Sequence, residues 1–451
     1  EDRLAAERAG LAVLAFVAAA PLIALKALMV WILVFNSLTM GLRLVSLFAR
    51  ATVKRRAAVA EMPRLADYKK LPRVSVLVPL LREEAVTGRL LDALAAMDYP
   101  APLLDIKLVL EEDDAITHAA IQRADLPPTI DVIMVPTDGL RTKPRAMNYA
   151  LPFCEGEIVG VYDAEDRPDP DQLRIVVAHL QNAPPKVACV QGYLDFYNDR
   201  QNWLSRCFTL EYAIWFRVIL HGVQRLGIPI PLGGTTVFFR RSVLEEIGAW
   251  DSHNVTEDAD LGMRLPRFGY RCEMIDSTTW EEANCHVRPW IRQRSRWLKG
   301  YVVTWATHMQ RPAALWRDLG PRGFIGFQVL FLGSITAYLS IPLFWIIMAS
   351  SLGLGLSFWS TFPDLLMTAF IASMIAGQAI MLTIAATAAA DGRRKRLLLI
   401  VPTLMFYWPL GAVAAYRAIG EVFSRPSYWH KTEHGLDPGD GKQAVASAGL
   451  D

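Results

Sequence analysis

The sequence predicts an α/β domain inserted between N- and C-terminal transmembrane helices. Of its 451 residues, 53% are hydrophobic and 20% are charged, which is too apolar for a soluble enzyme and too polar for membrane helices alone. Uncharged runs gather at the two ends of the chain. Between them, apolar β-branched runs alternate with helix-like stretches, a pattern typical of a mainly parallel sheet. The net charge of +2 gives no support to nucleic-acid binding, which needs a clustered basic excess.

The N-terminal region, 1–50, predicts a transmembrane hairpin. Uncharged stretches flank Pro21, and we expect arms at about 4–20 and 22–48, although the first arm is short for a full span. A single kinked span is the alternative. Residues 51–71 then form a linker. Because the chain begins with Glu rather than Met, we expect further residues upstream.

The C-terminal region, 311–423, predicts further membrane helices. Residues 323–363 carry no charge and predict one span followed by an external loop, and residues 365–390 predict another. A third uncharged stretch, 397–416, either spans the membrane or lies in its interface as an amphipathic helix. We favour the interface, because a third span would carry the tail, 424–451, to the outer side.

Basic clusters predict the orientation of these helices. Arg50 to Arg56 and Arg393 to Arg396 follow predicted spans, and such clusters face the cytoplasm. The middle of the chain, 72–310, is therefore expected in the cytosol. The five cysteines form no CxxC pair, which fits a reducing compartment better than a disulfide framework or a zinc knuckle.

Five apolar runs in the middle region predict the strands of the sheet. Helix-like stretches lie between them, for example at 83–97 and 170–181. In sheets of this kind the ligand lies beyond the carboxyl ends of the strands, so the residues after each run are candidates for the site. The runs are Val74–Pro79, Ile106–Leu110, Val132–Val135, Ile158–Tyr162 and Val187–Gln191.

Carboxylates follow two of these predicted strands, at Glu111–Asp114 and Asp163–Asp166. Hard divalent cations take oxygen ligands of this kind, and Mg²⁺ commonly shares its shell with substrate phosphates. Either cluster alone also fits a solvated loop, but two acidic strand ends in one sheet indicate a metal and nucleotide site. Lys143, just before a predicted helix, either helps to hold an anion there or starts the helix in water.

Three further segments have both a functional and a structural interpretation. In Val255–Asp260, Asp258 could take a proton from a hydroxyl, while Thr256 could cap a helix whose first turn is acidic. Adjacent glycines at Gly233 and Gly234 allow close approach of a ligand and also suit an ordinary turn. Trp290–Gly300 fits an interfacial helix with snorkelling arginines, or a cationic wall for a diphosphate with an aromatic face for a sugar.

Taken in order, these motifs resemble the membrane-embedded processive family-2 glycosyltransferases, the group that contains cellulose, chitin and hyaluronan synthases. The resemblance covers about 72–310 and the flanking helices, and the tail at 425–435 is similar to bacterial β-glucan and exopolysaccharide synthases. It implies a GT-A-type nucleotide-sugar transferase domain. The matching motifs are EEDD at 111–114, TKPRAMN at 142–148, DAED at 163–166, GGTTVFFRR at 233–241, TED at 256–258 and QRSRW at 293–297.

The resemblance implies a role for each matching position. Asp258 would be the general base, with Thr256 and Glu257 beside it. Glu112 would contact uridine, with Glu111 as a close rival. Metal ligands for Mg²⁺ or Mn²⁺ would be Asp163, Glu165 and Asp166. The nucleotide-sugar would also meet Lys143, Asp163, Gln293, Arg296 and Trp297. The acceptor would meet Gly234, Thr235 and Trp297, and a gating loop would contain Trp429, Lys431 and Thr432.

The function implied is an inverting, processive hexosyltransferase that polymerises a β-glucan from UDP-glucose and exports it across the bacterial inner membrane. Its expected partners are the UDP-sugar, the growing polysaccharide, the lipid bilayer and periplasmic export proteins, with no nucleic acid. An N-acetylhexosamine donor stays open. Two alternatives also stay open: a non-processive enzyme that adds one sugar to a polyisoprenyl phosphate, and an inactive membrane scaffold or receptor with the same fold.

Overall fold

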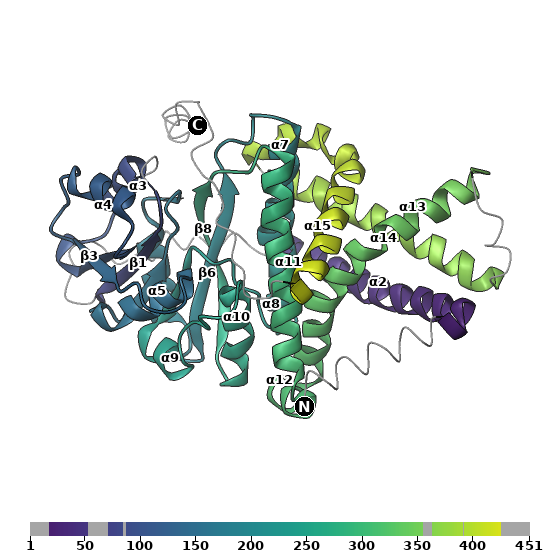
Figure 1. The fold of residues 1–451 in the computed structure, drawn as a ribbon, viewed down its shortest axis with the longest axis horizontal. Coiled ribbons are helices and arrows are strands. Elements are labelled where there is room, and N and C mark those ends of the chain that lie inside the picture. The colour runs from purple at the N-terminus through teal and green to yellow at the C-terminus, as the bar shows by residue number, and fades with distance from the viewer. Residues whose placement is uncertain (1–17, 53–70, 84–86, 355–362, 391, 425–451) are drawn as a thin grey trace.

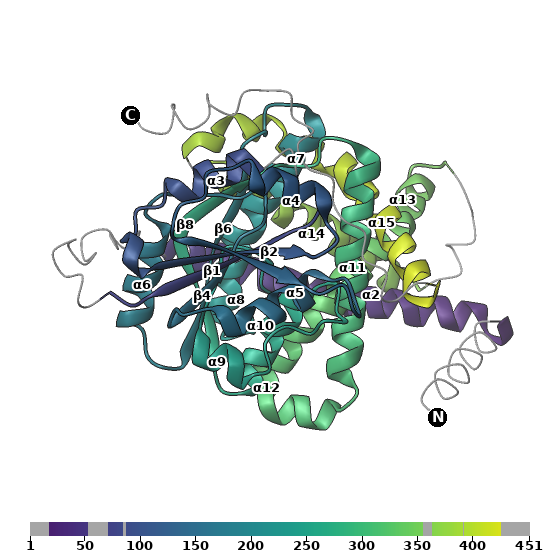
Figure 2. The ribbon, with the colours of Figure 1, turned by 60° about the vertical axis from the view of Figure 1, so that its left-hand side comes forward.

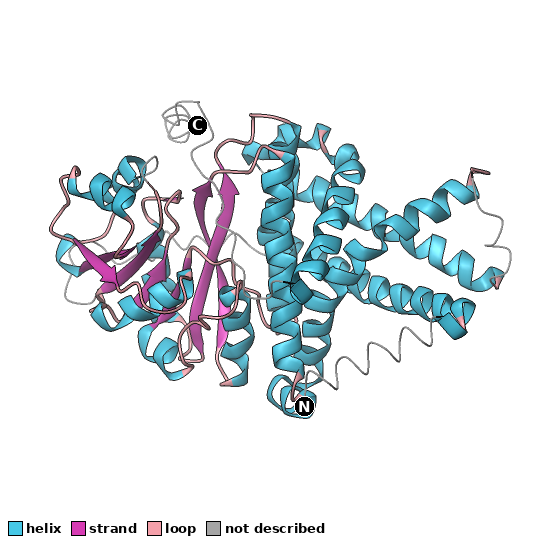
Figure 3. Cartoon of the chain, in the orientation of Figure 1, coloured by secondary structure: helices cyan, strands magenta, loops and turns pink. Residues whose placement is uncertain are grey.

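A computed structural model describes residues 18–52, 71–83, 87–354, 363–390 and 392–424. One part is built on a β-sheet with helices around it, and the other part is entirely helical (Figures 1 and 3). The long helix α11 (Val287–Met309) lies where the two parts meet (Figure 1). The predicted α/β domain between helical segments is confirmed.

Eight strands form a single sheet in the order β3-β2-β1-β4-β7-β6-β8-β5. All five predicted strands are present, and β6 extends further than predicted. The strands are β1 (Val74–Leu80), β2 (Leu104–Glu111), β3 (Ile130–Val135), β4 (Ile158–Val161), β5 (Arg167–Pro168), β6 (Val187–Phe196), β7 (Val237–Arg240) and β8 (Arg271–Glu281).

The sheet is mixed, where the sequence predicted mainly parallel strands. β2 pairs in parallel with β1 and β3, β1 with β4, and β6 with β8. β7 is antiparallel to both β4 and β6, and β5 is antiparallel to β8. β7 is antiparallel because it begins at the edge where β4 ends. After the turn at Gly233 and Gly234, its first residue, Val237, pairs with Val161, the last residue of β4. This turn therefore lies at the edge where the parallel strands end.

Hydrophobic clusters cover both faces of the sheet. Side chains of β1 alternate between them, with Val76 and Val78 in one cluster and Leu77 in the other, as the period of a strand requires. Figure 2 shows the helices around the sheet. They are α3 (Thr87–Ala95), α4 (Ala115–Gln122), α5 (Lys143–Ala150), α6 (Gln172–Asn182), α7 (Trp203–Ile214), α8 (Leu220–Arg225), α9 (Arg241–Glu246) and α10 (Glu257–Arg267), with a π-helical turn at Trp215–Ile219 and 3₁₀ turns at Ala101–Leu103 and Leu151–Phe153.

Within the described residues, three segments are long and apolar enough to cross a membrane: Pro21–Arg50, Pro312–Ser350 and Asp364–Ala389. The first and third match predicted spans, and the second begins earlier than predicted and bends at Gly320. The predicted arm 4–20 lies almost wholly outside the described residues. The helices of this part are α2 (Pro21–Thr52), α12 (Pro312–Phe327), α13 (Ser334–Ser351), α14 (Asp364–Ala389) and α15 (Leu404–Ser424), with a π-helical turn at Gln328–Gly333 and 3₁₀ turns at Gly392–Leu399 and Val401–Thr403.

The stretch 397–416 forms 3₁₀ turns and the start of α15, which packs against α11 and α13. Its interfacial position stays a prediction. The basic segment after α14 contacts the sheet part, where Arg394 pairs with Asp195 and Arg396 pairs with Asp199. The basic segment after α14 therefore lies against the α/β domain, and the orientation of both in a membrane stays a prediction.

One hydrophobic cluster continues from the sheet into the helical part. It contains Leu194 of β6 together with Leu42 of α2 and Ile384 of α14, all of them buried. Gly222 of α8 lies so close to Ser46 of α2 that a Cβ there would overlap the serine. The candidate membrane helices thus form one wall of the α/β domain.

Candidate functional site

Two cavities meet at the edge of the sheet where the parallel strands end. The sheet-edge cavity, about 180 Å³, is lined by residues that follow β1, β2 and β4 and by α11. The helical cavity, about 410 Å³, extends between α2, α13 and α14. The residues common to both walls are Tyr212, Gly233, Thr256, Asp258 and Trp297.

The first acidic run contributes one carboxylate to the sheet-edge cavity. Glu111 ends β2 in the cavity wall, with Arg145 Nη1 3.5 Å from its Oε2, and burial raises its pKa. Glu112 lies in the turn after β2, is exposed and does not line the cavity. Asp114 caps α4 by accepting from the backbone of Thr117. Of the two predicted contacts for uridine, Glu111 therefore lines the cavity and Glu112 does not.

Lys143 is held inside the sheet-edge cavity. It starts α5 after the cap residue Thr142, and its Nζ lies 2.5 Å from Asp163 Oδ1 and donates to the carbonyl oxygen of Gly234 at 3.0 Å. Burial by itself would lower the pKa of Lys143, but the charges of Asp163 and Glu257 raise it well above its ordinary value. The lysine is therefore a fixed cation in the cavity, and the interpretation as a helix-start lysine in water is wrong.

The second acidic run divides between the cavity and the interior. Asp163 and Glu165 line the sheet-edge cavity, and burial, followed by the charge of Asp163, raises the pKa of Glu165. Asp166 is buried and accepts from the backbone N–H of Asp163 at 2.7 Å and from the hydroxyl of Thr235. It thereby anchors the turn before β7. The three predicted metal ligands are not brought together, and the hydroxyl of Thr235 is engaged with Asp166.

In the described part of the chain, no group of three or more His, Cys, Asp or Glu side chains is arranged to hold a metal. Two carboxylates of the second acidic run, Asp163 and Glu165, nevertheless line the cavity. Glu281, at the end of β8, also lines it, and its buried Oε1 has no hydrogen-bond partner among the described residues. Mg²⁺ is commonly held by one or two carboxylates plus substrate phosphates. These residues therefore fit a divalent cation that binds together with a diphosphate.

Asp258, near the start of α10, lies in the walls of both cavities. Its Oδ1 accepts from the backbone N–H of Ala259 at 2.7 Å. Gly234 faces it with φ +80°, and a Cβ there would lie 2.6 Å from Asp258 Oδ2, so a glycine is needed. Burial raises the pKa of Asp258, although Lys143 and Arg296 oppose the shift. The carboxylate is thus a better proton acceptor than a surface aspartate.

Residues of α11 contact the segment that precedes Asp258 and hold it in place. Glu257 lines the sheet-edge cavity, and burial together with the charge of Asp258 raises its pKa to about 7. Thr256 does not cap α10 with its side chain, so that expectation is wrong: its hydroxyl lies 3.4 Å from Asn254 Oδ1, and its side chain packs on Gly300 of α11. Asn254, which the sequence did not indicate, donates in turn to Thr304 of α11 at 2.9 Å.

One face of α11 completes the sheet-edge cavity. Gln293, Arg296 and Trp297 line it together, as a spacing of three and four residues on a helix requires. Arg294 is largely shielded from solvent instead of snorkelling. It pairs with Glu211 of α7 at 2.5 Å, and its guanidinium lies 4.8 Å from the centre of the Trp297 ring. Arg294 and Glu211 therefore hold Trp297 in place, a role that the sequence did not reveal.

The structure thus gathers most of the predicted positions around one junction. The three predicted gating-loop residues lie outside the described residues: Trp429, Lys431 and Thr432.

Comparison with known proteins identifies the family of the domain. The model of the family "Glycosyltransferase like family 2" matches residues 72–300. The probable glycosyltransferase YdaM of Bacillus subtilis is 30% identical over 245 residues, 52% of this chain and 57% of its own. The β-monoglucosyldiacylglycerol synthase of Nostoc is 29% identical over 238 residues, 51% of this chain and 49% of its own. The chain thus spans about half the length of these curated relatives.

Among solved structures, the mannosyltransferase PcManGT from Pyrobaculum calidifontis, in complex with GDP-Man and Mn²⁺, superposes with a TM-score of 0.52. The superposition covers 86% of this chain and 99% of the PcManGT chain. At 20% sequence identity, this likeness shows the fold alone. The predicted GT-A-like fold and the predicted enzyme class, a hexosyltransferase, are confirmed. Since the family model covers half of the chain, including every strand of the sheet, the chain belongs to glycosyltransferase family 2.

Proposed function

We propose that the chain transfers a hexose from UDP-glucose with inversion at the anomeric carbon, using Asp258 as the general base. The observation that carries this proposal is the position of Asp258 at the junction of the two cavities. The sheet-edge cavity has the charged groups suited to a nucleotide diphosphate, and the helical cavity admits an acceptor. A single displacement needs its base between donor and acceptor, within reach of the hydroxyl that attacks.

On the donor side, Glu111 contacts the nucleoside, while Lys143 and Arg296 bind the diphosphate. Asp163 and Glu165 hold Mg²⁺ or Mn²⁺, which neutralises negative charge on the diphosphate when bound. The pKa of Lys143 is raised by its carboxylate neighbours, so it stays cationic at neutral pH. Fixed cations of this kind stabilise the charge that develops on the leaving group.

The reaction is then one step. The acceptor oxygen attacks the anomeric carbon, its proton passes to the Asp258 carboxylate, and the bond from carbon to the diphosphate oxygen breaks with its electron pair leaving on UDP. One displacement converts an α-linked donor into a β-linked product. Trp297, fixed by Arg294, offers a flat face at the point where both cavities meet.

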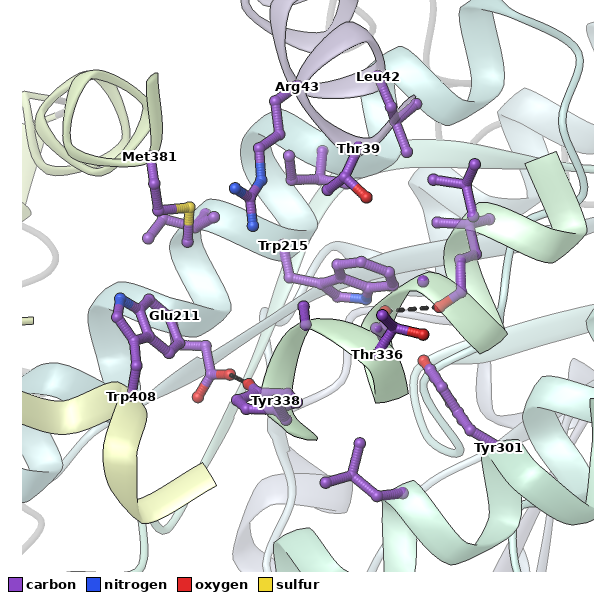
Figure 4. A pocket seen from close by; sticks show the side chains of 18 of the residues that line it. Thr39, Leu42, Arg43, Glu211, Trp215, Tyr301, Thr336, Tyr338, Met381 and Trp408 are labelled. Carbon is purple, nitrogen blue, oxygen red and sulfur yellow. Dashed lines mark hydrogen bonds between the residues drawn. The ribbon is translucent and has the colours of Figure 1, made fainter. Parts of the chain in front are cut away.

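We further propose that the product is a β-glucan, built processively and exported between the candidate spans. Aromatic side chains line the helical cavity, among them Trp215, Tyr301 and Trp408 (Figure 4), and flat rings suit a chain of sugars. The proposed location is the bacterial inner membrane, with the α/β domain in the cytoplasm and periplasmic export proteins beyond it. The basic segment at Arg393–Arg396 supports this orientation.

A second candidate is the transfer of one sugar to a lipid. Two observations favour it: alkyl side chains such as Ile32, Leu42 and Met374 line much of the helical cavity, and a relative is named a β-monoglucosyldiacylglycerol synthase. The two candidates share donor site, base and reaction, and they differ in the acceptor and the size of the product.

These proposals are tested by UDP release from the purified full chain, with Mg²⁺ or Mn²⁺ and a panel of UDP-sugars. Turnover with UDP-glucose and a high-molecular-weight product that a β-glucanase digests is the expected result. A short, lipid-extractable product would select the second candidate. Absence of turnover and of nucleotide-sugar binding with every sugar would contradict the transferase and leave an inactive scaffold.

Replacing Gly300 with alanine is expected to lower kcat without unfolding the protein. The added Cβ would overlap the side chain of Thr256 and move the start of α10, which carries Asp258. A displacement of about 1 Å at a reacting group can cost roughly 10²-fold in rate. UDP release measures the loss, and Gly420→Ala is the matched control, since a Cβ at Gly420 meets nothing within 4 Å. Equal kcat values for the two variants would contradict the contact's role in placing the base.

A further inference from the structure

An unpaired cation lies in the wall of the helical cavity. The guanidinium of Arg43, on α2, points into this cavity near Trp215 and Tyr338 (Figure 4). With the residues that the structure describes, Arg43 makes no hydrogen bond or ion pair. An arginine in a candidate membrane helix without a counter-charge is costly, and such residues mark binding sites or pathways.

The other charges of this cavity already have partners. Of its four charged wall residues, Glu211 and Arg294 pair with each other at 2.5 Å. Asp258 lies in the field of Lys143 and Arg296 on the sheet-edge side. Asp258 also accepts a hydrogen bond from the backbone N–H of Ala259. Arg43 is therefore the one charged side chain in the described wall with neither a hydrogen bond nor an ion pair, and an anion would supply its missing partner.

The depth of Arg43 indicates what kind of anion. The candidate span Pro21–Arg50 has 30 residues, roughly 45 Å of helix, which matches the hydrocarbon core plus both headgroup layers. Arg43 lies roughly 10 Å from the Arg50 end and Ile32 roughly 27 Å, at 1.5 Å of rise per residue. With this candidate span centred in a bilayer, Arg43 would lie near the boundary of headgroups and hydrocarbon, and Ile32 would lie well inside the hydrocarbon.

The wall of the cavity changes in the same direction. Asp258 and Trp297 lie where this cavity meets the sheet-edge cavity. Along α2 away from Arg43, the wall contains Thr39 and Asn36 and then the apolar Phe35 and Ile32. A hydroxyl, a phosphate and an alkyl chain in this order are the parts of a phospholipid whose headgroup carries a hydroxyl. A neutral lipid would leave the guanidinium unpaired.

We propose that the helical cavity binds a phosphodiester lipid with a hydroxyl-bearing headgroup, held by Arg43 through its phosphate. The headgroup hydroxyl reaches Asp258 and is the acceptor, either of a single sugar or of the first sugar of a chain, and the phosphodiester itself is unchanged. The acceptor role rests on the transferase function proposed above. Binding of the lipid by Arg43 does not depend on it.

The test uses the full chain in phosphatidylcholine nanodiscs that contain phosphatidylglycerol or, as the neutral comparison, diacylglycerol. Retention of each lipid by the detergent-extracted protein is measured by native mass spectrometry without donor, and transfer is measured with radiolabelled UDP-glucose. Arg43→Gln removes the charge and Arg43→Lys keeps it. Lys26→Gln is the matched control, a cation of the same helix outside the cavity wall.

We expect wild type and Lys26→Gln to retain phosphatidylglycerol in preference to diacylglycerol, and Arg43→Gln to lose roughly tenfold or more of that affinity, the size of one charge-assisted hydrogen bond. Arg43→Lys should keep part of it. Equal retention of both lipids, or an Arg43→Gln variant that retains phosphatidylglycerol like wild type, would overturn the proposal. Arg43-dependent retention without any sugar transfer or UDP release would instead support the lipid site and contradict the transferase function.

Discussion

Asp258→Asn is expected to lower kcat by about 10²–10⁴-fold, the usual contribution of a general base. Asparagine has the shape of aspartate and its oxygen can still accept from the N–H of Ala259, so the start of α10 should be preserved. It cannot accept the proton of the acceptor hydroxyl. UDP release under saturating donor measures the effect, and donor affinity, measured by nucleotide binding, should stay within about twofold of wild type.

The matched control for this variant is Asp276→Asn, because Asp276 is an exposed aspartate of β8 outside both cavity walls. It should behave as wild type. If Asp258→Asn kept more than about a tenth of the activity, Asp258 would not be the base. Glu257 would then be the next candidate, since it lines the same cavity and its pKa is raised to about 7.

Asp163→Asn is expected to lower the rate of UDP release by at least about 100-fold. A bound divalent cation supplies several kcal/mol of charge stabilisation, and each 1.4 kcal/mol is tenfold in rate. The variant removes one of two carboxylates that face the diphosphate position and also the ion pair that holds Lys143. We expect chelation by EDTA to stop wild-type turnover, Mg²⁺ or Mn²⁺ to restore it, and the variant to need much more metal for half-maximal rate.

A contrasting variant comes from the same motif. Asp166→Asn should lower the thermal unfolding temperature and leave the metal concentration for half-maximal rate close to that of wild type. The reason is that Asp166 is buried and accepts hydrogen bonds from the backbone N–H of Asp163 and the hydroxyl of Thr235. Differential scanning calorimetry and metal titration separate the two effects. Equal metal dependence in wild type and Asp163→Asn would contradict the assignment of Asp163 as a ligand.

Much of this architecture is predictable because local patterns carry it. The strands β1 to β4 follow from apolar β-branched runs, and the carboxylates after β2 and β4 follow from the rule that ligands lie at strand ends. The direction of β7 was missed, since it depends on the turn at Gly233 and Gly234 and not on the pattern of the strand. Which of Glu111 and Glu112 lines the cavity depends on where β2 ends, and that end follows from its pairing with β3, in which Glu111 is the last residue.

The remaining errors concern contacts between distant parts of the chain. Thr256 reads as a helix cap in isolation, but Gly300 of α11 brings a helix against its side chain. Arg294 reads as a snorkelling arginine, and only the arrival of Glu211 from α7 makes it a largely shielded ion pair beneath Trp297. Arg43 was not singled out at all, because an arginine near the end of an apolar helix is ordinary until a cavity opens beside it. Such roles require the tertiary structure.

The hydrophobic cluster that joins Leu194 of the sheet to Leu42 and Ile384 of the candidate spans has a consequence for how this protein can be changed. A transferase domain cut out at 72–310 would lose one wall of its own core and expose the apolar surface beneath it. The unit that can be exchanged between proteins, by engineers or by recombination, therefore includes α2 and α14 with the domain. Acceptor choice and stability would be inherited together in such an exchange.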